Sequence, residues 1–466
     1  MGGGKTLSIS YKTIGYISVL LLAISIGCLA NSSVEIIVFA VLIMVAPFFV
    51  YCCFKNDHLL IAVMIYFYIL DPCGNLISTW IKPLLLVIIG IKSFKYLKIN
   101  TGKMTKTIFL TISIVLPVYG ITISIFRGNQ LDYIITDASH YMFFIVGYLF
   151  LLMVKHDATI KFTVTKHLLI STFILSIVTI LMYISVRYGV VDIHEMDMLL
   201  RLKGIGMALI EINGNFRFFL AGQIFIVIST LFLFNNMLDI NVATQKMYVF
   251  TFFINIVAIV ISNTRGLWLG LIIGCGMLFM LKKFSYRKTL VVVSLFLLLT
   301  YAVLFLDVQL LGNLLDRIAS ISDFSGDNLS NHIRFIQSRE LINEFLLHPI
   351  LGGGFGAILE SGYMRGLMPY LFELSYLELL YKLGVVGMSL FVLSLSMILI
   401  KFSTTKNESN KSFLVSAYLS FLIISTTNPY IVSSLGMFLL SMLFVFTEGN
   451  VIESKLSDRR KCVMNA

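Results

Sequence analysis

Long apolar runs separated by short polar segments dominate the chain. A helix needs roughly 20 apolar residues to cross a bilayer, and fourteen runs come near that length. They lie near residues 14–30, 34–54, 58–70, 83–98, 107–126, 134–154, 167–189, 217–235, 247–262, 265–281, 289–306, 374–400, 412–427 and 430–447. The pattern predicts an all-α, polytopic integral membrane protein with about 12–14 transmembrane helices. The third run is short, and Lys92 and Lys95 shorten the apolar part of the fourth.

The composition agrees with this interpretation. Hydrophobic residues make up 58% of the chain and charged residues only 13%, whereas soluble domains contain about 25% charged residues. A water-soluble globule is therefore excluded. The first run follows Lys5 and Lys12 as in a signal peptide, but apolar runs continue to the end of the chain, so it is interpreted as an uncleaved first span.

The basic residues predict the orientation. With the N-terminus in the cytoplasm and the sides alternating, 23 of the 35 Lys and Arg residues and 7 of the 24 Asp and Glu residues fall inside. The inside then carries +16 and the outside −5, as expected when cytoplasmic loops are rich in Lys and Arg. Both termini are predicted to be cytoplasmic. Because insertion explains the net charge of +11, no nucleic-acid partner is expected.

The predicted spans divide the chain into four parts. A transmembrane bundle of eleven spans occupies residues 1–306, and an extracytoplasmic loop follows at 307–373. Three further spans occupy 374–447, and 448–466 form a cytoplasmic tail. Loops longer than about 15 residues are usually functional or disordered. The long loop contains five phenylalanines, so its composition favours an ordered, functional segment.

The long outer loop contains a predicted amphipathic helix near residues 331–348. Its apolar residues recur at helical spacing, Asn331 can cap its start and Pro349 ends it. The helix is expected on the outer membrane surface or against the bundle. Arg334 lies in its first turn, where free backbone N–H groups add to the guanidinium and favour an anion. A merely solvated arginine is the alternative.

Three arginines fall on the predicted outer face. Arg265 lies in the short turn between two spans, Arg217 lies at the outer end of the eighth span, and Arg334 lies in the loop. On a face with net negative charge they suggest an anionic ligand such as a diphosphate. The glycine-rich stretch 351–356 lacks the residues of a phosphate loop, so we interpret it as a tight, closely packed turn.

Two carboxylates lie near the start of the twelfth span. Glu378 and Lys382 are four residues apart in the favourable order and are predicted to form a structural pair on the helix surface. Glu373 lies one turn nearer the outside without a partner at that spacing, so it is either a general base or a solvated carboxylate. His348 precedes Pro349 with no Cys or carboxylate constellation around it, so no metal site is expected.

Three motifs carry a family resemblance. They are Ser262-Asn-Thr-Arg265-Gly-Leu-Trp268, His348-Pro-Ile-Leu-Gly-Gly-Gly-Phe-Gly356 preceded by Arg334, and Leu374-Ser-Tyr-Leu-Glu-Leu-Leu-Tyr-Lys-Leu-Gly-Val-Val-Gly387. In this order, and on one predicted side, they resemble the superfamily of O-antigen polymerases, O-antigen ligases and bacterial protein O-oligosaccharyltransferases. The resemblance covers about residues 260–390. The first 200 residues match only in hydropathy.

The resemblance implies a reaction and its place. A glycan on undecaprenyl diphosphate is presented at the outer leaflet of the bacterial inner membrane, and a sugar hydroxyl displaces the lipid diphosphate without metal, nucleotide sugar or cofactor. It implies that Arg265, and less directly Arg334, are catalytic, with Glu373 as the candidate base. The expected substrate-binding residues are Arg217, His348 and Tyr376. Membrane lipids and a chain-length regulator protein are further candidate partners.

One departure from the family pattern favours a polymerase. Ligases of the superfamily typically carry His-Asn before the Tyr-Leu of the third motif, with the His as base. Here the stretch reads Phe372-Glu373-Leu374-Ser375-Tyr376. Either Glu373 replaces that base, or oriented substrates react without one. The expected function is a surface-polysaccharide repeat-unit polymerase, with a ligase or protein O-oligosaccharyltransferase as the alternative. A polysaccharide flippase is the alternative of another class, but transporters typically show repeats and short outer loops.

Overall fold

The computed structural model describes residues 52–53, 55–70, 76–96, 98–202, 206–212, 215–239, 246–282, 329–359 and 369–448. Its helices and strands, in chain order, are α3 (Asp57–Leu70), α4 (Leu76–Ser93), η1 (Phe94–Tyr96), α5 (Lys103–Leu110), η2 (Thr111–Val115), α6 (Leu116–Arg127), α7 (Leu131–Met142), α8 (Ile145–His156), α9 (Thr159–Arg187), α10 (Ile193–Leu202), β1 (Gly206–Ile212), β2 (Asn215–Leu220), α11 (Gln223–Asp239), α12 (Lys246–Ile261), α13 (Arg265–Leu281), α16 (Leu329–Leu347), α17 (Ser375–Ser403), α18 (Glu408–Ile424), α19 (Ser434–Leu443) and η4 (Phe444–Thr447).

The predicted fold class, an all-α polytopic membrane protein, is confirmed. Among the described residues, four helical segments are long and apolar enough to cross a membrane: Lys103–Arg127, Leu131–His156, Thr159–Arg187 and Ser375–Ser403. Shorter apolar helices coincide with most of the other predicted runs. The predicted spans near 14–30 and 289–306, nearly all of 34–54 and most of the tail 448–466 lie outside the described ranges. The total of 12–14 spans and the division into loop and bundle stay predictions.

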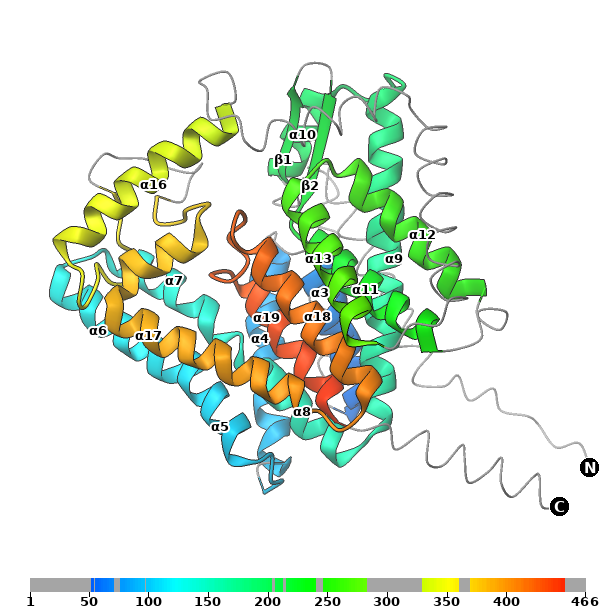
Figure 1. Cartoon of the computed structure of the whole chain (residues 1–466), viewed down its shortest axis with the longest axis horizontal. Helices are drawn as coiled ribbons and strands as arrows, with labels where there is room; N and C mark the ends of the chain where they lie inside the picture. Colours follow the sequence, from blue (N-terminus) through cyan, green and yellow to red (C-terminus); the bar gives the residue numbers. More distant parts are fainter. Residues whose placement is uncertain are drawn as a thin grey trace, which may run out of the picture.

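The helix ends that the sequence places in the cytoplasm lie together at one end of the bundle. Lys92 of α4 forms an ion pair with Asp57 at the start of α3. Near the end of α8, Lys155 pairs with Glu448 at 3.4 Å. Lys161 of α9 donates a hydrogen bond of 2.9 Å to the carbonyl of the same Glu448. These contacts join helix ends that the sequence assigns to the same side, and the full alternation of sides stays a prediction (Figure 1).

A β-hairpin replaces the start of the predicted span near 217–235. Strand β1 pairs antiparallel with β2, with Leu209 opposite Phe218 and Ile210 opposite Arg217. Helix α11 begins only at Gln223. The stretch around Arg217 is rich in aromatic residues, which suit a strand, and buried Phe218 packs with Val186 at the end of α9. An apolar run alone does not distinguish such a strand from the first turns of a helix.

Helix α16 confirms the predicted helix of the long loop, with two corrections. It begins at Leu329, so Asn331 lies inside the helix, the predicted cap is wrong, and Arg334 lies in the second turn rather than in the first. Its apolar residues also divide between two sides. Leu341 is buried against α17, whereas Phe335 and Leu346 are exposed on the side that points away. One side of the helix thus packs on the bundle and leaves an apolar side outside.

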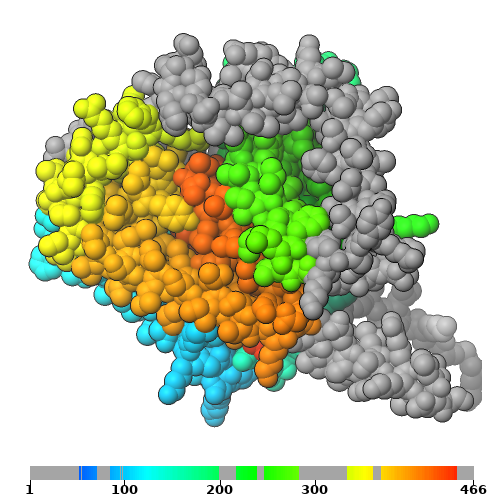
Figure 2. All heavy atoms as spheres, viewed as in Figure 1, coloured from blue at the N-terminus to red at the C-terminus, as the bar shows by residue number. Residues whose placement is uncertain are grey.

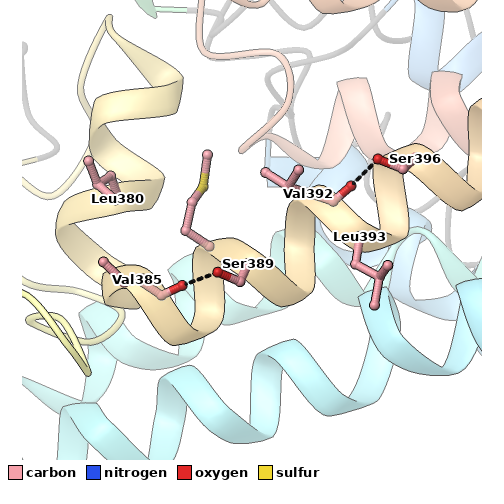
Figure 3. A pocket seen from close by; sticks show the side chains of 7 residues that line it. Leu380, Val385, Ser389, Val392, Leu393 and Ser396 are labelled. Atoms are coloured by element: carbon pink, nitrogen blue, oxygen red, sulfur yellow. Dashed lines mark hydrogen bonds between the residues drawn. The ribbon is translucent and has the colours of Figure 1, made fainter.

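Helix α17 is broken at Gly384, where φ is 62° and ψ is −173° (Figure 3). The glycine-rich segment 349–354 satisfies the backbone groups that the break frees. Gly353 and Gly354 donate to the carbonyls of Tyr381 and Lys382 at 2.9 and 2.8 Å. In return, the amides of Val385 and Val386 donate to the carbonyls at positions 349 and 350, at 2.8 and 3.2 Å. The glycine-rich segment is therefore the closely packed turn that the sequence predicts.

Gly384→Ala is expected to destabilise the protein. This backbone region is almost exclusive to glycine and costs other residues about 1–3 kcal/mol. A Cβ would also lie 2.4 Å from the carbonyl oxygen of Ile350. Thermal unfolding of the purified protein in detergent measures the effect. Gly276→Ala is the matched control, because its Cβ meets nothing within 4 Å in helix α13. Equal melting temperatures for the two variants would contradict the strain at the break.

Candidate functional site at the outer end of the bundle

Arg334 of α16 and Glu373, just before α17, form an ion pair. The guanidinium Nε lies 3.0 Å from Glu373 Oε2, and the side chains are 21% and 23% exposed. Gln337, one turn further along α16, is buried and accepts hydrogen bonds from the backbone N–H groups of Glu373 and Leu374, at 3.0 and 3.2 Å. The structure thus brings two of the predicted catalytic residues together in a partly open position.

One to two turns further along, Glu378 and Lys382 of α17 form a buried charge cluster with Asp137 of α7. Lys382 Nζ is 2.6 Å from Asp137 Oδ2 of α7 and 2.6 Å from Glu378 Oε1, with all three side chains 1% exposed or less. The ammonium also donates to the carbonyl of Tyr370 at 2.7 Å. The predicted Glu378–Lys382 pair is confirmed, but it is buried rather than on the helix surface. Asp137, on a distant helix, is the member that the sequence did not indicate.

The two carboxylates of the cluster also hold backbone groups. Asp137 Oδ2 accepts a hydrogen bond from the N–H of Gly356 at 2.9 Å, and Glu378 Oε2 accepts one from the N–H of Phe372 at 3.2 Å. Burial raises the pKa of the Tyr370 phenol, and the negative charge of Asp137 adds to the rise. The cluster therefore anchors Gly356, at the end of the glycine-rich stretch 351–356, and the residues that lead into α17, next to Glu373.

The turn between α18 and α19 contacts three elements that carry predicted site residues. They are the start of α13 with Arg265, the start of α17 with Tyr376, and the end of the hairpin with Arg217. The carbonyl of Asn428 accepts a hydrogen bond from the hydroxyl of Ser375 at 3.0 Å. A Cβ on Gly266, next to Arg265, would lie 2.6 Å from Asn428 Nδ2. Tyr430 donates to the carbonyl at position 221, just after β2, at 3.2 Å. Figure 2 shows this orange-red part of the chain between the orange surface of α17 and the green surface of the middle of the chain.

Sequence reasoning missed this turn as part of the site. A signal was present, because Thr426-Thr427-Asn428-Pro429 is a polar break between two apolar runs. The turn places Arg265, which begins α13 and is partly exposed, near the start of α17. Arg217 lies on the hairpin that leads to the same turn, with its guanidinium 5.5 Å from the centre of the Phe219 ring.

Two predicted substrate-binding residues, Tyr376 and His348, do not contact the Arg334–Glu373 pair through the bonds described below. The hydroxyl of Tyr376 donates to the carbonyl of Leu422 at 2.9 Å, so it faces α18. His348 lies just beyond the end of α16, 14 residues after Arg334. At 1.5 Å per residue that corresponds to roughly 20 Å. Within the described ranges, no group of three His, Cys, Asp or Glu side chains could hold a metal ion.

The helices and the charged residues gathered at one end define a polytopic membrane protein with a polar site above its bundle. Residues 250–392 match the model of a protein family described as O-antigen ligase. The match includes Arg265, Arg334, Glu373 and the break in α17, and it supports the superfamily of ligases and polymerases that the motifs resemble. Members of this family are glycosyltransferase-like enzymes. The search of curated proteins finds no match for the chain.

Lys382→Met is expected to destabilise the protein strongly, because it leaves two carboxylates buried without a cation. Removing one partner from a buried ionic cluster costs about 3–5 kcal/mol. Thermal unfolding in detergent measures the loss. Lys411→Met is the control, since Lys411 pairs with Glu408, whose side chain is 79% exposed. The combined variant Asp137→Asn, Glu378→Gln, Lys382→Met should recover part of the loss. A single Lys382→Met variant as stable as the control would contradict an ionised cluster.

Proposed function

We propose that the protein is a repeat-unit polymerase of a surface polysaccharide. It transfers a growing glycan from undecaprenyl diphosphate onto another lipid-linked repeat unit at the outer face of the membrane. The observation that carries the proposal is the Arg334–Glu373 pair, a cation and a carboxylate in one partly open position. The family match supports the superfamily of ligases and polymerases. The absence of histidine between Phe372 and Tyr376 favours the polymerase.

The chemistry requires one bond to form and one to break at the anomeric carbon. The acceptor hydroxyl attacks this carbon, and the bond to the diphosphate oxygen breaks, so that the lipid diphosphate leaves with the electron pair. Arg265 and Arg334 stabilise the charge that develops on the diphosphate. Glu373 takes the proton of the attacking hydroxyl. This assignment gives the two arginines one role and Glu373 another.

The ion pair suggests how donor binding prepares the base. Without donor, Arg334 is held by one carboxylate oxygen of Glu373. A diphosphate carries more negative charge than a carboxylate and offers more acceptor oxygens. When it binds, Arg334 turns to the phosphate and leaves that carboxylate oxygen to the acceptor hydroxyl. Gln337 keeps the backbone of Glu373 in place during the exchange, because its bonds are to the backbone.

An apolar hollow on α17 supports a lipid-linked donor. It has a volume of about 440 Å³ and lies in the bend of the broken helix, between Leu380 on one arm and Val385 to Ser396 on the other (Figure 3). The hydroxyls of Ser389 and Ser396 donate to carbonyls one turn earlier, at 2.7 and 2.9 Å, so they are already satisfied. The hollow begins within two turns of Glu373 and offers an apolar surface to part of a polyprenyl chain.

Arg265→Ala and Arg334→Ala should each reduce polymer formation about 100- to 1,000-fold, as expected when a donor to a developing oxyanion is removed. The assay reconstitutes the protein with undecaprenyl-diphosphate-linked repeat units alone and follows the ladder of products on a gel. Arg339→Ala is the control, because Arg339 lies exposed on the other side of α16. Undiminished product from either variant would remove that arginine from the mechanism. A wild-type protein that makes no ladder, but transfers the glycan to a different acceptor, would be a ligase.

Glu373→Gln should lower turnover about 100-fold or more, in the range of general-base catalysis, and change donor binding little. Single-turnover rates and binding of the lipid-linked donor separate the two effects. Glu408→Gln is the control, since its side chain is 79% exposed at the other end of the bundle. Wild-type turnover in Glu373→Gln would show that the reaction proceeds with oriented substrates and without this base.

A further inference from the structure

A second hollow lies at the predicted cytoplasmic end, away from the site of the proposed reaction. It has a volume of about 460 Å³ and is lined by residues of α9, α11, α12 and α18 and by Phe446. Helix α9 has 29 residues, or roughly 43 Å at 1.5 Å per residue. Its last turn supports the hairpin at the outer end, whereas its first two turns, with Lys161 and Lys166, line this hollow.

The lining changes from polar to apolar along the helices. Lys161, Lys166 and Asn410 lie near helix starts, and Tyr248 lies in the first turn of α12. Further from the helix ends the wall is apolar and includes Phe173 and Phe232. No carboxylate is among the described residues that line the hollow. The nearby carboxylates of Glu448 and Glu408 pair instead with Lys155 and Lys411.

Asn410 supplies a separate indication of a ligand. Its side-chain Nδ2 is buried and has no hydrogen-bond partner among the described residues. A buried donor without a partner costs about 1–3 kcal/mol. Because Asn410 lines the hollow, a rotation of its amide toward an acceptor there would remove this cost. Asn410, Lys161 and Tyr248 are each the third residue of their helices. Three helix starts therefore meet at this hollow. Asp157 and Asn407 cap the starts of α9 and α18, so the positive charge of the hollow comes from Lys161 and Lys166.

We propose that this hollow binds an anionic glycerophospholipid of the cytoplasmic leaflet. The phosphate lies between Lys161, Lys166 and the Asn410 amide, and an acyl chain follows the apolar wall. Basic pockets between transmembrane helices on the cytoplasmic side suit such headgroups. Lys161 takes part although it already donates to the carbonyl of Glu448, because an ammonium has three N–H donors. The site depends on the predicted orientation and is independent of the proposed polymerase activity.

Native mass spectrometry of the delipidated full chain in detergent tests the proposal. We compare the first bound phosphatidylglycerol with the first bound phosphatidylcholine of the same acyl chains. The wild type should prefer phosphatidylglycerol about tenfold, and Lys161→Gln combined with Lys166→Gln should lose that preference. Glutamine keeps a donor for the carbonyl of Glu448, and thermal unfolding checks that the variant is folded.

The matched control is Lys103→Gln combined with Lys106→Gln. These lysines also lie on the predicted cytoplasmic side, three residues apart on one helix, and both are exposed outside the hollow. The control should keep the wild-type preference, and Asn410→Ala should weaken it several-fold. Equal binding of the two lipids by the wild type, or an unchanged preference in the Lys161 and Lys166 variant, overturns the proposal. Displacement by equimolar soluble glycerophosphoglycerol also overturns it, because the site would then bind a free phosphate ester.

Discussion

The break in helix α17 is the constraint on which the outer end of the molecule depends. Within an apolar layer, backbone groups freed by a broken helix have no water to bond and need partners from the protein. Segment 349–354 supplies donors and acceptors on both sides of Gly384. Because each bond fixes a point of that segment against α17, the end of α16 and the start of α17 are held at set positions. Arg334, near the other end of α16, meets Glu373 just before the start of α17.

The two groups of charged residues near the start of α17 differ in burial. Lys382, Asp137 and Glu378 are shielded from solvent, so separating them would leave charges unpaired in a medium of low dielectric constant. Arg334 and Glu373 are each about one-fifth exposed, where water compensates a separated charge far better. The first group is therefore suited to fixing the loops, and the second to exchanging partners. A site that binds and releases a charged substrate needs both properties.

Much of the fold follows from local sequence patterns, whereas the site depends on distant contacts. Hydropathy predicts the helices, and spacing of four predicts the Glu378–Lys382 pair, because both depend on residues within one helix. Asp137 joins that pair from about 240 positions away, and Arg334 meets Glu373 across 39 positions. No spacing rule reaches that far. The hairpin around Arg217 could not be predicted from the sequence either, since its apolar residues are equally compatible with a helix.

Membrane insertion explains the basic residues on the cytoplasmic side better than it explains the outer arginines. Lysines and arginines on the cytoplasmic side are explained by membrane insertion, and a few of them, such as Lys161 and Lys166, line a hollow suited to an anionic lipid. Arg265 and Arg334 lie on the predicted opposite side. The insertion rule disfavours Arg265, which lies in a short turn, but it does not apply to Arg334, which lies in a loop of more than 60 residues. Arg334 meets a carboxylate there, in a segment held by Gln337 and by the turn at Asn428. Membrane insertion alone therefore does not account for these two arginines, which the proposed reaction would use to stabilise its diphosphate.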